Sequence, residues 1–222
     1  MGRLLPLVAL FVAGLSHAAE IAIDIGHTRA KPGALSASGV WEFDFNRTFV
    51  RALELQLASV GVGSHVINDS GKVGSLSGRT TLARKDRFFV SIHHDSVKQR
   101  YRPVKDPRFK GYSLWVSERN ADYEGSVRCA RLIADELLKA RFQPSHYHSD
   151  AVYGENRPVV DWDRGIFSNN QLAVLAAARG PAILVEVGVI ANPAEETVLS
   201  DPAMTEARAR TIATGLQHCL AG

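Results

Sequence analysis

Blocks of like charge are missing from this 222-residue sequence, although it contains 26 basic and 23 acidic residues and has a formal net charge of +3. Arms that bind nucleic acid are built from such blocks, so we expect no nucleic-acid partner. Internal repeats, low-complexity tracts and a linker between domains are missing too. With an apolar content of 45% and a charged content of 22%, the composition is typical of a globular domain.

Cysteine is scarce, because the chain contains only Cys129 and Cys219. Neither is expected to be a nucleophile, since no histidine or basic cluster lies beside Cys129 and Cys219 is three residues from the end. The two could form a disulfide in an oxidising compartment, or remain two buried thiols. Spacing along the chain does not decide between these alternatives, because it does not fix the Cα–Cα separation.

Only one long hydrophobic run is present, from Leu4 to Leu15, and it is shorter than the ~20 apolar residues that span a bilayer. Arg3 precedes this run, and small residues around Ala18 follow it. The pattern predicts a secretory signal peptide over residues 1–18. The alternative is an uncleaved membrane anchor. After cleavage, residues 19–222 would have no stable membrane anchor and would lie in the periplasm or be secreted.

Segments with strand character alternate with segments of helical spacing along the rest of the chain. This alternation predicts a single α/β domain with a twisted, mostly parallel sheet and helices on both faces. Residues 143–158 are expected to form an irregular insertion between two of the later elements. The predicted strands are 20–25, 64–68, 87–92, 112–116 and 182–187, and the predicted helices are 41–60, 77–85, 122–141, 169–178 and 202–220.

Four titratable residues fall where the carboxyl ends of such strands would meet. His27 follows the first strand after Gly26, which we take as the pivot of the turn, and Glu42 begins the next helix. His93 follows a later strand, and Glu186 lies inside an apolar one. A carboxylate in an apolar strand is costly unless it is paired or bound to a metal. Three ligands drawn from His, Asp and Glu are typical of zinc hydrolases, so the set indicates a metal site.

Each of these residues also has an ordinary structural explanation. His27 could bond the backbone of its turn, Glu42 could favour a helix N-terminus, and Glu186 could pair with an arginine. His94 could replace His93 as the ligand. Since alternate side chains of a strand share a face, the register of Ser91 favours His93. Four coincidences at one edge of a sheet are less probable than one site.

Several motifs together resemble the zinc-dependent N-acetylmuramoyl-L-alanine amidases of the Amidase_3 type, from about residue 21 to the C-terminus. They are I-D-I-G-H at 23–27, P-G-A at 32–34, the glutamate fifteen residues after His27, S-I-H at 91–93 and V-E-V-G-V-I-A-N-P at 185–193. The resemblance implies that His27, Glu42 and His93 bind zinc and that Glu186 is the catalytic carboxylate. It implies peptidoglycan as the substrate, cleaved between N-acetylmuramic acid and the L-alanine of the stem peptide.

Further residues have weaker predicted roles. Arg164, in D-R-G, resembles a stretch near the substrate groove of the family, and Asp24 is a candidate acceptor for the N–H of a metal-bound histidine. The insertion carries His148 and Glu155. The simpler interpretation of residues 143–158 is a mobile polar loop. The alternative, implied by some family members, is a segment that blocks the metal and is displaced by a protein activator.

Two other functions are compatible with the same residues. One is a zinc peptidase that acts on stem peptides, because metal ligands do not define which amide is cleaved. The other is a peptidoglycan-binding protein that keeps the fold without catalysis. The intact set of ligands and Glu186 disfavours the second, since a binding protein does not need a buried carboxylate.

Overall fold

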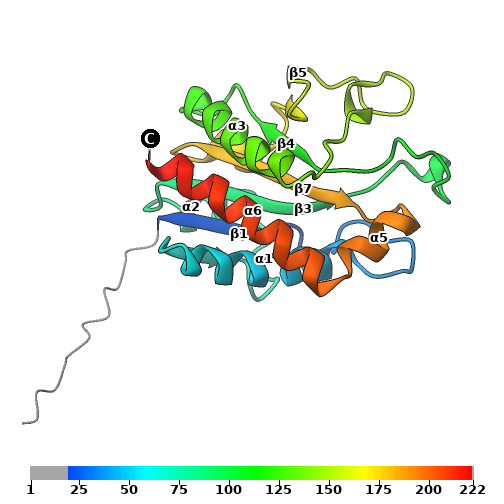
Figure 1. Cartoon of the computed structure of the whole chain (residues 1–222). Helices are drawn as coiled ribbons and strands as arrows, with labels where there is room; N and C mark the ends of the chain where they lie inside the picture. The colour runs from blue at the N-terminus through cyan, green and yellow to red at the C-terminus, as the bar shows by residue number, and fades with distance from the viewer. Residues whose placement is uncertain (1–19, 222) are drawn as a thin grey trace, which may run out of the picture.

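The computed structural model describes residues 20–221, and Figure 1 shows a sheet with helices packed on both sides. The predicted signal peptide, residues 1–18, lies outside the described residues. Within residues 20–221, no helix has the length and apolar character needed to cross a membrane.

Seven strands form one sheet, and they are β1 (Ile21–Ile25), β2 (Ser64–Ile67), β3 (Phe88–Asp95), β4 (Ser113–Val116), β5 (Val159–Asp161), β6 (Ile166–Ser168) and β7 (Ala182–Val189). Their order in space is β2-β1-β3-β7-β4-β6-β5. The pairs β1–β2, β1–β3, β3–β7 and β4–β6 are parallel, whereas β4–β7 and β5–β6 are antiparallel. The predicted mostly parallel sheet is confirmed.

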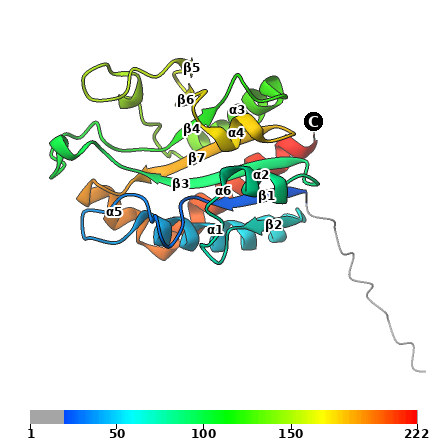
Figure 2. The same ribbon diagram turned by 180° about the vertical axis from the view of Figure 1, so that it is seen from behind.

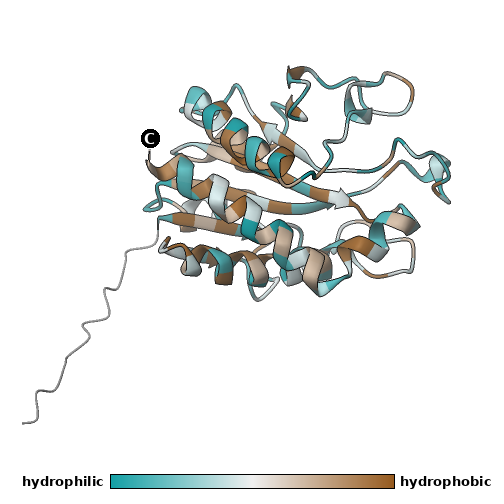
Figure 3. Ribbon diagram, viewed as in Figure 1, coloured by the Kyte–Doolittle hydropathy of each residue, from teal (hydrophilic) through white to brown (hydrophobic). Residues whose placement is uncertain are grey.

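The helices lie on the two faces of this sheet, as predicted. They are α1 (Glu42–Ser59), α2 (Leu76–Leu82), α3 (Tyr123–Lys139), α4 (Ala173–Ala177), α5 (Pro193–Leu199) and α6 (Pro202–Ala221). Figure 1 shows α1, α3 and α6 side by side on one face, and Figure 2 shows α2 and α4 on the other. Figure 3 shows hydrophobic positions concentrated in the strands and alternating with hydrophilic ones along α3.

The period-two alternation of the strands gives the two faces of the sheet separate core clusters, and a third, smaller cluster lies around Phe109 and Tyr147. Ile21, Ile23 and Ile25 of β1 pack in the cluster with α1, α3 and α6, whereas Ala22 packs in the cluster with α4. On that second face several positions are polar instead of apolar. They are Asp24 in β1, Ser91 and His93 in β3, Ser113 in β4 and Glu186 in β7. These polar side chains thus form a polar surface on the face of the sheet that α2 and α4 cover.

Some element boundaries differ from the prediction. β3 continues through His93 and His94 to Asp95, because β7 pairs with it well beyond Ile92. The helix predicted over residues 169–178 is shorter, because the backbone N–H of Asn169 bonds the carbonyl of Val116 and extends the β6 connection. The three-residue strands β5 and β6 are too short to show a period, so they were not predicted. Helix α5, also missed, does carry a start signal, Asn192 before Pro193.

A disulfide joins Cys129 of α3 to Cys219 of α6, with a Cα–Cα distance of 5.0 Å. The two helices pack closely, and Gly215 lies against the backbone of Ile133. The disulfide, one of the two alternatives left open by the sequence, is the state that the structure has. It ties the C-terminal helix to the middle of the chain.

Candidate metal centre

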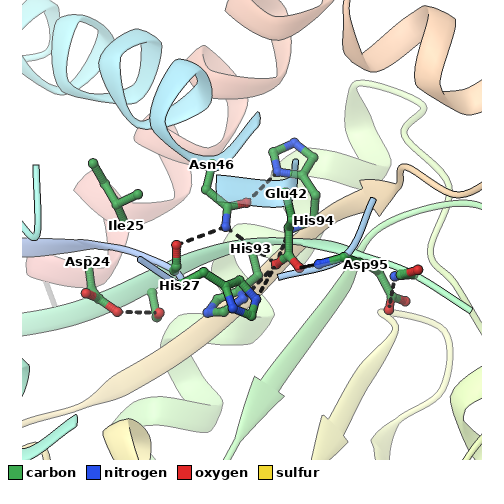
Figure 4. Close-up of polar contacts among 12 residues, drawn as sticks. Asp24, Ile25, His27, Glu42, Asn46, His93, His94 and Asp95 are labelled. Atoms are coloured by element: carbon green, nitrogen blue, oxygen red, sulfur yellow. Dashed lines mark hydrogen bonds and ion pairs between the residues drawn. The ribbon is translucent and has the colours of Figure 1, made fainter. Parts of the chain in front are cut away.

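The side chains of His27, Glu42 and His93 come together beside the ends of β1 and β3 (Figure 4). The Oε1 atom of Glu42 lies 2.9 Å from Nε2 of His27 and 3.0 Å from Nδ1 of His93. The three residues offer one ligand atom each, and these atoms lie within 4.8 Å of one another. The structure therefore brings the three predicted ligands into one group that could hold a metal ion.

The turn that places His27 is made by His27 itself. Its φ angle is +66°, in the left-handed region that non-glycine residues seldom adopt. The backbone carbonyl of His27 accepts hydrogen bonds from the side chains of Asn68 and Arg79, which hold this conformation. The proposal that Gly26 is the pivot was wrong, because the positive φ lies one residue later.

Two glycines are needed here because they leave room for ligands. A Cβ atom on Gly26 would lie 2.4 Å from Nε2 of His93, and one on Gly33 would lie 2.4 Å from Oε2 of Glu42. Both distances are far below van der Waals contact. The motifs I-D-I-G-H and P-G-A therefore place a glycine at two points where the backbone lies close to a ligand side chain, Gly26 beside His93 and Gly33 beside Glu42.

Glu42 is buried and surrounded by donors. Burial would raise the pKa of its carboxyl group, but hydrogen bonds from the imidazoles of His27 and His93 outweigh that effect and lower the pKa well below its ordinary value. Its other oxygen, Oε2, accepts the backbone N–H of Ala34 at 3.1 Å. Glu42 is thus an ionised carboxylate, the form that binds a cation.

His94 points to the opposite face of β3. Its Nδ1 atom lies 2.8 Å from Oδ1 of Asn46, and its ring packs beside Phe45 and Phe49 of α1. Burial lowers the pKa of His94 to about 3, so the ring is neutral. Strand alternation therefore places His93, and not His94, beside Glu42.

Glu186 lies on the same face as His93, one strand away. In the register of the sheet it is the neighbour of His93 on β3 and of Ser113 on β4. Its Oε2 atom is buried and has no hydrogen-bond partner among residues 20–221, and no ion pair with an arginine is found there. Burial and the nearby carboxylates of Asp95 and Glu42 raise the pKa of Glu186 well above its ordinary value. The arrangement leaves Glu186 available for proton transfer.

Two cavities open on this face of the sheet. One, of about 670 Å³, has His27 and His93 in its lining together with Arg29 and Lys31. The other, of about 240 Å³, has Glu186 in its lining together with residues of the insertion. Leu172 and Leu184 line both cavities. The two histidines and Glu186 thus line adjoining cavities instead of one closed pocket, and Glu42 lines neither of them.

The insertion contacts the Glu186 side of the site and not the three donors. Nε2 of His148 lies 2.9 Å from Oδ2 of Asp95 and 3.3 Å from Oγ of Ser113, and the hydroxyl of Tyr147 donates to Asp95. Glu155 lines the smaller cavity and pairs with Arg157 at 2.7 Å. Neither His148 nor Glu155 belongs to the metal-binding group, so a role for them as caps of the metal has no support here.

Asp95 and Tyr147 are residues that the sequence analysis missed. Asp95 follows S-I-H-H at two positions from His93, so strand alternation was a signal that could have found it. Tyr147 lies in an irregular segment, where no periodicity indicates the direction of a side chain.

Asp24 is close to the group but does not accept a histidine N–H. Nη1 of Arg79 lies 3.0 Å from its Oδ1 atom, and the hydroxyl of Ser91 donates to its Oδ2 atom at 2.7 Å. The predicted contact with a ligand imidazole was therefore wrong. Asp24 pairs with Arg79, whose guanidinium also donates to the carbonyl of His27.

Arg164 does not line either cavity. Its Nε atom lies 2.7 Å from Oδ1 of Asp135 in α3, and its Nη1 atom lies 3.4 Å from Oδ2 of Asp161. The pair with Asp135 ties the turn between β5 and β6 to α3, whereas the pair with Asp161 lies within this hairpin. The predicted contact with substrate has no support from this position.

Residues 21–218 match the family described as N-acetylmuramoyl-L-alanine amidase, Amidase_3. Because the match extends over nearly all of the described residues, the chain belongs to this family of amidases. The resemblance inferred from the motifs is thereby confirmed.

Curated relatives carry the same description. The chain is 28% identical over 215 residues to N-acetylmuramoyl-L-alanine amidase AmiC of Neisseria meningitidis, covering 89% of this chain and 52% of that protein. It is 26% identical to a putative N-acetylmuramoyl-L-alanine amidase of Buchnera aphidicola, covering 81% and 86% of the two chains. The chain thus spans about half the length of the first of these relatives.

Solved structures of amidases share the fold. An N-acetylmuramoyl-L-alanine amidase of Clostridium difficile 630 is similar with a TM-score of 0.74 and 24% identity, covering 93% of this chain and 99% of that one. Ami1 of Mycobacterium smegmatis is similar with a TM-score of 0.73 and 21% identity, covering 90% and 96%. At these identities the similarity shows the fold alone.

Proposed function

We propose that the chain is a peptidoglycan hydrolase that cleaves the amide bond between N-acetylmuramic acid and the L-alanine of the stem peptide. The observation that carries the proposal is the position of Glu186 one strand away from His93, whose imidazole forms one group of possible metal ligands with His27 and Glu42. Membership of the amidase family supports this reaction over other uses of the same groups.

Zinc is the cofactor that these donors fit best. Two imidazoles and one carboxylate form a ligand set that catalytic zinc sites use, with a further position left for water or substrate. The ionised state of Glu42 and the spacing of the three ligand atoms within 4.8 Å are compatible with one bound cation. When bound there, zinc would polarise the amide carbonyl and lower the pKa of a coordinated water molecule.

Glu186 is proposed as the general base and then the general acid. An amide is cleaved only if the attacking water loses a proton and the departing nitrogen gains one, and a single carboxylate can do both in turn. Burial raises the pKa of Glu186, which favours its protonated form and suits a group that must hold a proton between these steps. Its Oε2 atom has no competing partner among residues 20–221.

The place of action is proposed to be the periplasm or the cell exterior, where peptidoglycan lies. The signal peptide proposed for residues 1–18 supports this location, and so does the disulfide between α3 and α6, since disulfides persist in oxidising compartments.

A protein activator is proposed as a partner. One structure similar to this chain, with a TM-score of 0.69 and 20% identity, is the CwlD amidase of Clostridioides difficile in complex with the GerS lipoprotein. In this chain the insertion lies beside Glu186, with His148 and Tyr147 bonded to Asp95. A partner that moves the insertion would therefore change access to Glu186 and not to the three donors.

Digestion of purified sacculi with and without a chelator tests the proposed function. New amino termini of L-alanine, released only without chelator, are expected for an amidase. New ends inside the stem peptide would indicate the alternative zinc peptidase. Binding to sacculi without any new ends would indicate a non-catalytic binding protein.

A further inference from the structure

Two buried polar side chains lie behind Glu42, away from the two cavities. Asn46 is one helical turn after Glu42 on α1 and is fully buried, and His94 is the neighbour of His93 on β3 and is 2% exposed. Nδ2 of Asn46 lies 3.3 Å from the carbonyl oxygen of Gly26 and 3.5 Å from Oε1 of Glu42, and its Oδ1 lies 2.8 Å from Nδ1 of His94 (Figure 4). An unsatisfied polar group in such a place would be costly.

The chemistry of the neighbours fixes the orientation of the Asn46 amide. The carbonyl of Gly26 and the carboxylate of Glu42 can only accept hydrogen bonds, so the NH₂ group of Asn46 must face them. Its Oδ1 atom then faces His94, which must donate from Nδ1. A flipped amide would set its oxygen against two other oxygens. His94 therefore supplies the donor that Oδ1 needs in the orientation in which Asn46 donates to Glu42, and with the carbonyl of Gly26 it holds the amide there.

This contact gains importance when a cation is bound. Imidazole nitrogens that coordinate a metal carry no proton, so the hydrogen bonds from His27 and His93 to Oε1 of Glu42 are lost in the loaded protein. The donors to Glu42 that remain within residues 20–221 are Nδ2 of Asn46 and the backbone N–H groups of His94 and Ala34. Of these, only Asn46 uses a side chain, so its orientation must be fixed by a neighbour.

We propose that His94 and Asn46 form a positioning pair for the metal ligand Glu42. His94 fixes the Asn46 amide, and the amide holds the Glu42 carboxylate in the orientation that binds the cation. Phe45 and Phe49 hold the His94 ring, with centroids 5.4 Å and 6.1 Å away. The inference rests on the proposed function only in that the three donors bind zinc; it does not require amidase activity.

Zinc affinity of the metal-free protein, measured by competition with a chromophoric chelator, tests the pair. Asn46→Ala and His94→Leu are expected to weaken zinc binding by about 10- to 100-fold, the usual loss when a group behind a metal ligand is removed. His94→Asn keeps an N–H donor near the position of Nδ1 and should stay close to wild type. The double variant Asn46→Ala/His94→Leu should bind zinc no more weakly than Asn46→Ala. The reason is that His94 acts on Glu42 only through Asn46, so its loss has no further effect once Asn46 is gone.

Leu53→Ala is the matched control for packing, because Leu53 is a buried apolar residue of α1, about two turns after Asn46, and its truncation removes no hydrogen bond. It should lower the unfolding temperature of the metal-free protein and keep the zinc affinity. Equal affinities in all variants, or equal losses in His94→Asn and His94→Leu, would overturn the inference, since the second result would mean that ring packing and not the donor matters.

The tautomer of His94 gives a readout that does not depend on folding of any variant. In the wild-type protein, nitrogen-15 spectra of the imidazole should show the proton on Nδ1 with and without zinc. A proton on Nε2 alone would overturn the inference. A wild-type protein that binds no zinc would overturn it together with the metal assignment, whereas zinc binding without turnover would contradict the amidase activity alone.

Discussion

At the scale of single residues, the site combines a backbone conformation of raised energy, at His27, with a buried carboxylate oxygen, on Glu186, that has no hydrogen-bond partner among residues 20–221. His27 in the left-handed region carries an expected cost of ~1–3 kcal/mol, and Asn68 and Arg79 hold it there through its carbonyl. Costs of this kind persist where a site needs the geometry.

Gly26→Ala should weaken zinc binding by about tenfold or more, because the new Cβ atom would lie 2.4 Å from Nε2 of His93 and displace that ring. Titration of the metal-free protein with zinc measures the effect. Gly74→Ala is the matched control, since a Cβ atom there meets nothing within 4 Å. An unchanged affinity in Gly26→Ala would contradict the assignment of His93 as a ligand.

Glu186→Gln should stabilise the metal-free protein at neutral pH and not at acid pH. The pKa of Glu186 is higher in the folded than in the unfolded protein. Below its unfolded-state pKa the carboxyl group is protonated in both states, so its burial costs little free energy. As the pH rises from the unfolded-state pKa to the folded-state pKa, the free energy of unfolding falls. Glutamine cannot ionise and removes this loss. Unfolding temperatures of both proteins across that window measure it. A wild-type protein that is the more stable one at neutral pH would show that Glu186 has a stabilising partner.

At the scale of elements, the strands carry the site and the segments between them complete it. The motif residues of β1, β3 and β7 could be placed from the sequence because strand alternation puts Ser91, His93 and Glu186 on one face. Asp95 was missed because the predicted strand ended too early. The contacts of His148 could not be predicted, since an irregular segment has no period that gives the direction of its side chains.

Deletion of residues 144–156 should raise the basal rate on sacculi if the insertion restricts access to Glu186. The segment supplies Tyr147 and His148 to the wall of the smaller cavity. A Tyr147→Phe/His148→Ala variant, which releases the segment from Asp95 without shortening the chain, should change the rate in the same direction. An unchanged or lower rate in both would show that the insertion forms part of the substrate-binding surface instead.

At the scale of the whole molecule, the sheet carries His93 and Glu186, and the segment from the end of β1 to the start of α1 brings His27 and Glu42 to them. The mostly parallel topology could be predicted because apolar strand segments alternate with helical ones. The antiparallel pairing of β4 with β7 could not be predicted, because the length of the segment between two strands does not determine whether they run parallel or antiparallel. Helices α1, α3 and α6 cover one face of the sheet, and the site lies on the face that the shorter helices α2 and α4 cover in part.

Removal of the disulfide with Cys129→Ala/Cys219→Ala should lower the free energy of unfolding by about 4 kcal/mol, because the bond closes a loop of 90 residues in the unfolded chain. Chemical denaturation of the variant and of the wild type, with and without reductant, measures the loss. The reductant should destabilise only the wild type. Equal stability of the oxidised wild type and the variant would mean that packing of α3 on α6 alone holds the C-terminal helix.

The roles of zinc and Glu186 are tested together on a defined muramoyl peptide. Zinc-loaded wild-type protein and the Glu186→Gln variant are compared, with products identified by mass spectrometry and zinc content measured on the same samples. The wild type should release peptides that begin with L-alanine. The variant should keep its zinc and lose activity by about 10²- to 10⁴-fold, the contribution expected of a general acid–base group. Full turnover by a zinc-loaded Glu186→Gln protein, or wild-type products cut inside the stem peptide, would contradict the account.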